Sequence, residues 1–228
     1  MEPKKYPCEL PNYIDINLIE HEPDTLDEIR YGVTFVYNDR KESTKTVIVI
    51  MKNPSNSLQG STSEKSKLLI DETTDIILRF LHRYKVRYGK KEMIKKVIIL
   101  NLFPCYGSNP NEINVRYKFD DKDYDESLLY NDELVHNRKY ISDTINKIED
   151  ATVICAWGRY GSEEKVIKSY YEKQIELVMN DLLKLRKYIS VVAKNSYKIK
   201  KPFLPTHGRA WKCEEHTICT TPTKDINY

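Results

Sequence analysis

Three apolar segments of this sequence each stop at polar residues whose side chains could do chemistry. They are "VIVIMKNPS" over 47–55, "VIILNLFP" over 97–104 and "CAWGRYG" over 155–161. The first ends at Asn53 and the second at Asn101, and a side-chain amide offers a hydrogen-bond donor and an acceptor without charge. That pair of functions suits the edge of a nucleobase, so the sequence points to a site that reads or holds a base.

These side chains can converge only if the three segments are neighbouring parallel strands of one sheet. Strands that alternate with helices indicate βαβ units, so we predict an α/β fold, a three-layer α/β/α sandwich with a mostly parallel central sheet. In such sheets ligands bind beyond the carboxyl ends of the strands, where all three polar segments would lie. The expected strands cover 31–37, 46–51, 96–102, 151–157 and 189–194. We expect three helices: one that begins after Asp71, one over about 131–148 and one over about 163–188.

Length and turn signals predict one domain with two flanking segments. The 228 residues, 40% of them hydrophobic, suffice for one substantial core. We expect an irregular N-terminal arm over 1–29, a single α/β domain over 30–211 and a C-terminal tail over 212–228. The turn-rich "NDRKES" between the first two strands predicts a hairpin, and therefore an antiparallel pair of 31–37 with 46–51.

Composition narrows the classes of function. The formal net charge of +3, with 31% charged residues, permits a nucleic-acid partner without demanding one. No segment reaches the roughly 20 apolar residues of a membrane span, and the N-terminus lacks the apolar core of a signal peptide. With five scattered cysteines, this predicts a cytoplasmic protein with reduced thiols. The chain has neither a G-x-G-x-x-G motif nor a P-loop, so we expect no cofactor.

A cluster of soft ligands near the C-terminus raises zinc as an alternative. Cys213, His216 and Cys219 lie with His207 inside thirteen residues, and tetrahedral zinc favours such groups. The spacing matches no established zinc finger, so we expect no metal. If a metal were bound, Cys213, His216 and Cys219 would hold it.

The polar strand ends, taken in order with the segments between them, resemble a known family. The series "IMKNPS", "DETTDIILRF", "VIILNLFPCYGSNP", "YND", "CAWGRYG" and "LPTHG", spread over about 30–211, is similar to DUF1643, a bacterial and phage family of unknown function. Three departures stand out. Lys52 stands where a Leu is usual, Glu72 stands where a Pro is usual, and "HGRAW", which includes His207, replaces a His-Pro-Leu-Tyr ending.

The order of these motifs also resembles, more remotely, the uracil-DNA glycosylase superfamily. That resemblance implies that Asn53 positions the attacking water, that Asn101 pairs with a flipped base and that His207 contacts the departing base. It allows Asp71 a catalytic role, although the same residue is a good N-cap for the first helix. The remaining candidates are Phe103, Tyr106 and Trp157 for stacking on the base, and Pro54, Ser55, Gly158 and Arg159 for loop contacts.

These residues fit hydrolysis of an N-glycosidic bond, which needs a positioned water and a stabilised leaving base but no strong base. We expect a DNA glycosylase-like enzyme that acts on a base, including a modified one, in double- or single-stranded DNA, in repair or antiviral defence. Two alternatives stay open: a non-catalytic module that binds nucleotides or nucleic acid, and a hydrolase of free nucleosides or nucleotides. The amine of Lys52 could instead attack the sugar as a lyase, but strand alternation directs it to the face opposite Asn53.

Overall fold

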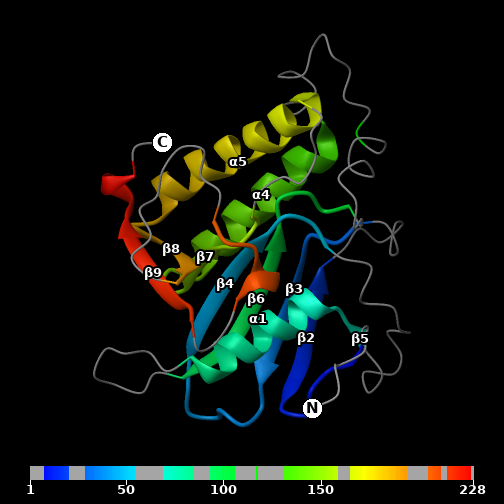
Figure 1. Ribbon diagram of the computed structural model, residues 1–228, viewed down its shortest axis with the longest axis vertical. Helices are drawn as coiled ribbons and strands as arrows, with labels where there is room; N and C mark the ends of the chain where they lie inside the picture. The colour runs from blue at the N-terminus through cyan, green and yellow to red at the C-terminus, as the bar shows by residue number, and fades with distance from the viewer. Residues whose placement is uncertain are drawn as a thin grey trace.

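The computed structural model shows a mixed seven-stranded sheet with helices on both of its faces (Figure 1). It describes residues 8–20, 29–54, 69–84, 93–105, 117, 131–158, 165–194, 205–211 and 215–226. The strands are β1 (Cys8–Glu9), β2 (Ile14–Glu20), β3 (Gly32–Tyr37), β4 (Lys45–Met51), β5 (Leu69–Ile70), β6 (Ile94–Asn101), β7 (Thr152–Cys155), β8 (Tyr188–Ala193) and β9 (Thr217–Pro222). The helices are α1 (Glu72–Arg83), α4 (Asp132–Lys147) and α5 (Lys165–Leu185), with 3-10 turns η2 (Gly208–Ala210) and η3 (Thr223–Asp225).

Four parallel strands form the centre of the sheet, in the order β6-β4-β7-β8. At one side β3 pairs antiparallel with β6 and β2 with β3, and at the other side β9 pairs antiparallel with β8. The chain leaves β4 through α1 toward β6, whereas it leaves β7 through α5 toward β8, in the opposite direction. The carboxyl ends of β4 and β7 therefore flank the point where the connections diverge, which is where open α/β sheets bind ligands.

Strand alternation separates the apolar side chains into two cores, one on each face of the sheet. Along β4, Val47, Val49 and Met51 belong to the core that includes α1, whereas Ile48 and Ile50 belong to the core that includes α4 and α5. Both sets are buried, because helices cover the central strands on two sides. The uninterrupted apolar run of β4 thus serves two separate cores.

The helices begin where the sequence supplies capping side chains. Asp71 caps α1 by accepting a hydrogen bond from the Thr74 amide, and Asn131 caps α4 by accepting one from the Leu134 amide at 3.0 Å. The three predicted helices and the five predicted strands are confirmed within a few residues at each end. Across the described ranges, no helix combines the length and the apolar character that crossing a bilayer requires.

The predicted hairpin between the first two core strands is wrong. β3 and β4 follow one another in sequence, yet β6 lies between them, antiparallel to β3 and parallel to β4. Turn residues specify a reversal of the chain but not which strand lies alongside, and β4 gains two parallel apolar neighbours in this arrangement. With three antiparallel pairings beside three parallel ones, the sheet is mixed rather than mostly parallel.

Both flanking segments contribute strands, contrary to the expected irregular arm and tail. β2 lies within the N-terminal 29 residues and pairs with β3, and β9 lies within the C-terminal segment and pairs with β8. Ile14, Ile16 and Leu18 alternate with polar residues, which is the period-two signal of an edge strand. β9 carries a weaker signal, since its residues are mostly half-buried and its register depends on six pairings with β8.

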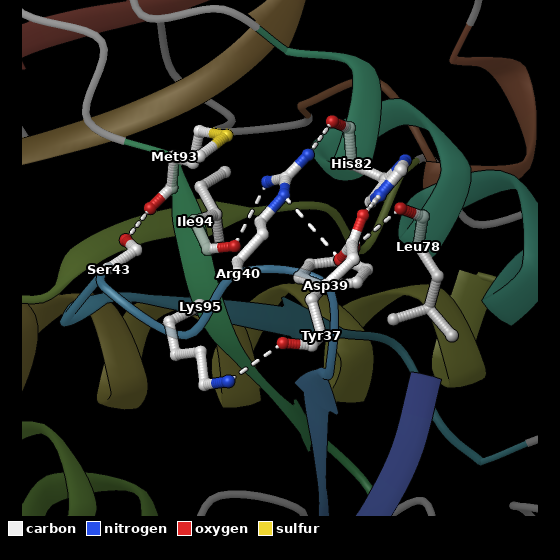
Figure 2. A network of polar contacts seen from close by, with 9 residues as sticks. All are labelled: Tyr37, Asp39, Arg40, Ser43, Leu78, His82, Met93, Ile94 and Lys95. Carbon is white, nitrogen blue, oxygen red and sulfur yellow. Dashed lines mark hydrogen bonds and ion pairs between the residues drawn. The ribbon is translucent and has the colours of Figure 1, made fainter. Parts of the chain in front are cut away.

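A buried arginine at the amino-terminal edge of the parallel strands ties α1 to the sheet, as Figure 2 shows. The Arg40 guanidinium is 6% exposed and donates to the Ile94 carbonyl at 3.0 Å and to the carbonyl of His82, in the last turn of α1. It also lies over the Tyr37 ring, 5.0 Å from the centroid, and the Tyr37 hydroxyl donates to the Leu78 carbonyl. These contacts fix the end of α1 against the start of β6, and so orient the helix whose first turn reaches the opposite edge.

Candidate functional site

Residues from separate segments meet at the carboxyl ends of β4 and β7. β4 stays paired beyond its last residue, because the Phe103 amide donates to the Lys52 carbonyl at 2.9 Å. On its other side, the Ala156 amide donates to the Ile50 carbonyl at 2.8 Å. Both strand ends are thus held in register, and the chain beyond them carries the candidate residues. We call the following group the switch-point cluster: Lys52, Asn53, Asp71, Gly158 and His207.

Side chains from α4 and α5 bind the backbone carbonyls at the end of β6. Asn137 donates to the carbonyls of Asn101 and Leu102, at 2.8 and 3.0 Å, and Gln174 donates to that of Leu102 at 2.9 Å. Both donors are fully buried, and leaving one such carbonyl without a partner would cost about 1–3 kcal/mol. The end of β6 is therefore fixed from the face that α4 and α5 cover.

Tyr171 of α5 has the same role at the end of β7. Its hydroxyl lies 3.0 Å from the Trp157 carbonyl and 2.9 Å from the Gly158 carbonyl, as a shared donor. Its ring faces Lys52, whose Nζ lies 5.4 Å from the ring centroid. Lys52 is half-buried, and burial lowers the pKa of its amine. One tyrosine thus joins the first residue after β4 to the residues that follow β7.

His207 precedes η2 and lies against the end of β7. Its Nδ1 accepts a hydrogen bond from the Arg209 amide at 3.2 Å. Gly158 has a φ of +72°, and a Cβ built there would lie 2.7 Å from the Cβ of His207. The segment 205–211, which we call the late loop, therefore packs directly on the end of β7. Because Nδ1 is the acceptor, the proton of the neutral ring resides on Nε2, which is therefore a hydrogen-bond donor.

The surroundings of His207 keep its imidazole neutral. Its pKa is lowered to about 4, chiefly by burial and then by the positive charges of Lys52 and Arg209. The Asp71 carboxylate acts in the opposite direction. At pH 7 the ring therefore carries no charge and presents a fixed N–H donor.

Asp71 and the residue after it connect α1 to the late loop. Asp71 caps α1, as expected, and its catalytic role stays a prediction. Glu72 forms an ion pair with Arg209, with 2.6 Å between the Glu72 Oε2 and the Arg209 Nη2. This ion pair joins the first residue of α1 to the 3-10 turn η2.

Two of the supporting contacts were not expected from the sequence. The pairing of Glu72 with Arg209 joins residues far apart in the chain, so no local sequence pattern indicates it. Tyr171 fits the apolar face of a helix, so its sequence position gives no sign that its hydroxyl binds the end of β7.

The two predicted amides have different environments. Asn53 is half-buried, and its Nδ2 lies 3.3 Å from the carbonyl of Pro54, which is buried. Asn101 is 1% exposed, and its Nδ2 donates to the Arg30 carbonyl at 3.1 Å. The Asn101 amide that would donate to a base therefore already donates to a carbonyl of the protein in this structure.

The predicted base-stacking rings that the structure describes lie in the core. Phe103 is 1% exposed and Trp157 is 0% exposed, and both belong to the core on the face that α4 and α5 cover. Phe103 packs beside Tyr171, with 6.2 Å between ring centroids. The rings fill space beneath the strand ends, whereas the sequence-based interpretation placed them on a surface open to a base.

Several expected residues lie outside the described part of the chain: Ser55, Tyr106, Arg159 and Cys213. Of the proposed zinc ligands, His216 immediately precedes β9 and Cys219 lies within it. Among the residues that the structure describes, no group of three or more potential metal ligands occurs.

Gly158→Ala tests the contact between the late loop and β7. We expect the free energy of unfolding to fall by about 2–5 kcal/mol, because a left-handed backbone costs a non-glycine residue about 1–2 kcal/mol and overpacking adds about 1–3 kcal/mol. Denaturant unfolding measures the loss, and the NMR signals of the His207 ring should shift. Gly158→Asn tolerates the positive φ better but keeps the Cβ, so it should remain destabilised. Unchanged stability and unchanged His207 signals in Gly158→Ala would contradict the contact.

Comparison with known proteins identifies a family. A family model described as "Protein of unknown function (DUF1643)" matches residues 30–200. The match includes every member of the switch-point cluster except His207, which lies seven residues beyond it. No curated protein and no solved structure matches the chain.

Proposed function

We propose that this chain, which belongs to the DUF1643 family, hydrolyses the N-glycosidic bond that joins a base, including a modified base, to DNA. The observation that carries the proposal is His207, a neutral imidazole whose Nε2–H is fixed beside the ends of β4 and β7. In this reaction negative charge develops on the departing base, and a preorganised donor at that position lowers the barrier.

A neutral donor suits this reaction because the imidazole does not have to gain or lose a proton. The ring is held by its Nδ1 hydrogen bond to the Arg209 amide and by its packing on Gly158, so its donor is oriented before a base arrives. The positive charges of Lys52 and Arg209 act on the same region. They favour both an anionic leaving base and the phosphates of the DNA backbone.

Asn53 would hold the attacking water in this proposal. It follows β4 almost directly and is half-buried, so its backbone is anchored by the sheet while its side chain keeps some access to solvent. An amide both donates and accepts, so it can orient a water molecule without taking its proton. The oxocarbenium-like sugar that forms as the base departs reacts readily with water placed in this way.

The remote resemblance to the uracil-DNA glycosylase superfamily, and the three-layer fold that it implies, form part of the proposal. Asn53 follows the first parallel strand along the chain, Asn101 ends the second, and His207 lies in the late loop, which is the order of that pattern. Pairing of Asn101 with a flipped base requires it to exchange its hydrogen bond to the Arg30 carbonyl for one to the base.

Asn53→Ala tests the proposed reaction. The protein is incubated with DNA that carries uracil and with phage DNA that carries hypermodified cytosines, and abasic sites are counted. We expect abasic sites from at least one substrate and a loss of about 100-fold in Asn53→Ala, the scale of a misplaced reactant. Asn146→Ala, on the exposed side of α4, is the matched control and should keep full activity.

The outcomes also separate the alternatives. Absence of abasic sites from every DNA, or full activity in Asn53→Ala, would overturn the proposal. DNA binding without bond cleavage would identify a binding module, and cleavage of free nucleosides or nucleotides alone would identify a hydrolase of small molecules.

A further inference from the structure

We infer that the switch-point cluster also carries a lyase activity, with Lys52 as the nucleophile toward the open-chain aldehyde of an abasic sugar. This inference rests on the proposed function, because base excision is the reaction that produces an abasic sugar at this position. Lys52 would form an imine with the sugar, and the DNA strand would then be cleaved on the 3′ side of that sugar.

The placement of Lys52 differs from that of a lysine on a solvated surface. Its backbone carbonyl accepts the Phe103 amide, so its Cα is fixed by the sheet, and its side chain is half-buried. Its Nζ lies 5.4 Å from the centroid of the Tyr171 ring. Because the Tyr171 hydroxyl is bonded to the carbonyls of Trp157 and Gly158, the amine is held next to the end of β7.

The orientation of Lys52 toward α5 does not separate it from the cluster. Lys52 continues the alternation of Ile48 and Ile50 toward the face that α4 and α5 cover, and its Nζ contacts the Tyr171 ring there. However, His207 lies against Gly158 and experiences the charge of Lys52, so the imidazole and the amine share the region at the end of β7. A base that accepts a hydrogen bond from His207 would bring its own sugar toward this region.

The environment of the amine also favours its reactive form. Only an unprotonated amine adds to a carbonyl, and burial lowers the pKa of Lys52. A larger fraction of this side chain is therefore free amine at neutral pH than is the case for an exposed lysine.

The proposed reaction balances without an added oxidant or reductant. The Lys52 amine adds to C1′ of the aldehyde, and the carbinolamine loses water to give a protonated imine. Solvent takes a proton from C2′, and the electron pair expels the 3′ oxygen with its phosphate as the C3′–O bond breaks. Water then hydrolyses the imine, which restores the Lys52 amine and releases an unsaturated aldehyde on the other strand fragment.

Borohydride trapping on DNA with a preformed abasic site tests this inference. Borohydride reduces the imine to a stable amine, so we expect a covalent protein–DNA adduct that mass spectrometry maps to Lys52. In Lys52→Arg, which keeps the positive charge but forms no such imine, the adduct and the strand cleavage seen without borohydride should fall at least about 100-fold. Lys139→Arg, on the exposed side of α4, should trap like the unchanged protein.

Each outcome decides the question. No adduct with the unchanged protein, or an undiminished adduct in Lys52→Arg, would overturn the lyase. Lys52→Gln repeats the test if the arginine variant does not fold. Since the abasic site is preformed, base excision without trapping overturns the lyase alone, whereas trapping without base excision from any DNA overturns the proposed function alone.

Discussion

His207→Asn is expected to slow base excision about 100- to 1,000-fold, the range observed when one preorganised donor to a developing anion is removed. Asparagine is a good N-cap, so it should preserve the start of η2 while removing the Nε2–H that the imidazole presents. Single-turnover rates on the DNA that gives abasic sites measure the effect. Because the loss concerns the transition state, the affinity for the DNA should change far less than the rate.

His136→Asn is the matched control for this prediction. His136 is exposed on α4 and contacts the Tyr31 ring, with 4.8 Å between the ring centroids. Substituting it therefore makes the same chemical change away from the switch-point cluster. The His136→Asn variant should excise bases at the rate of the unchanged protein. A His207→Asn protein that is folded and excises bases at the normal rate would remove His207 from the reaction.

His207 also predicts how rate and stability depend on pH. With its pKa lowered to about 4, the ring is neutral throughout the range from pH 8 to 5.5, so the rate should not show the titration of an ordinary histidine near 6.5. The unfolded chain binds the proton of His207 more tightly than the folded chain does, so stability falls as the pH drops from 6.5 toward 4 and is fully present above 6.5. Denaturant unfolding at several pH values should show that His207→Asn lacks this dependence.

Arg40→Met is expected to lower the free energy of unfolding by about 2–4 kcal/mol, because a buried carbonyl that loses its donor costs about 1–3 kcal/mol and two carbonyls lose theirs. The substitution leaves the carbonyls of Ile94 and His82 without the guanidinium that binds them. It also removes the cation from the Tyr37 ring and from Asp39, whose Oδ1 lies 4.0 Å from the arginine Nε. Chemical denaturation with a two-state fit measures the change.

Arg83→Met, in the exposed last turn of α1, is the matched control and should change stability by no more than about 0.5 kcal/mol. Since Arg40 lies at the edge opposite the switch-point cluster, the folded fraction of Arg40→Met should excise bases normally. Equal stability of Arg40→Met and the unchanged protein would show that the buried guanidinium contributes nothing to holding α1 in place.

Local signals predicted the helices and most strands of this fold, whereas strand neighbours required the structure. Asp71 marks the start of α1 because its capping bond spans only three residues. The insertion of β6 between β3 and β4 depends on pairings 49 to 68 residues apart, such as Lys45 with Ile94 and Gly32 with Leu100, for which no local pattern exists. The alternation of Ile14, Ile16 and Leu18 with polar residues does indicate β2. The conformation of β9 depends on its pairing with β8 more than on its own residues.

The candidate site shows the same division. The polar residues after β4 and β7 could be predicted, because parallel strands bring their carboxyl ends to one edge. The burial of Asn101 and Trp157 could not, because it depends on donors and rings that α4 and α5 contribute from the far side of the sheet. Nor could the neutral state of His207, which results from burial, from the charge of Lys52 on a distant segment and from that of Arg209 two residues away.

The packing of His207 on Gly158 has a consequence for the order in which the protein is made. All four parallel strands are complete when synthesis reaches Ala193, but the imidazole that we assign to catalysis follows fourteen residues later. The parallel strands therefore leave the ribosome before the late loop does, so the centre of the sheet can form first. Competence for the proposed reaction would then arise when the late loop docks on a preformed strand end.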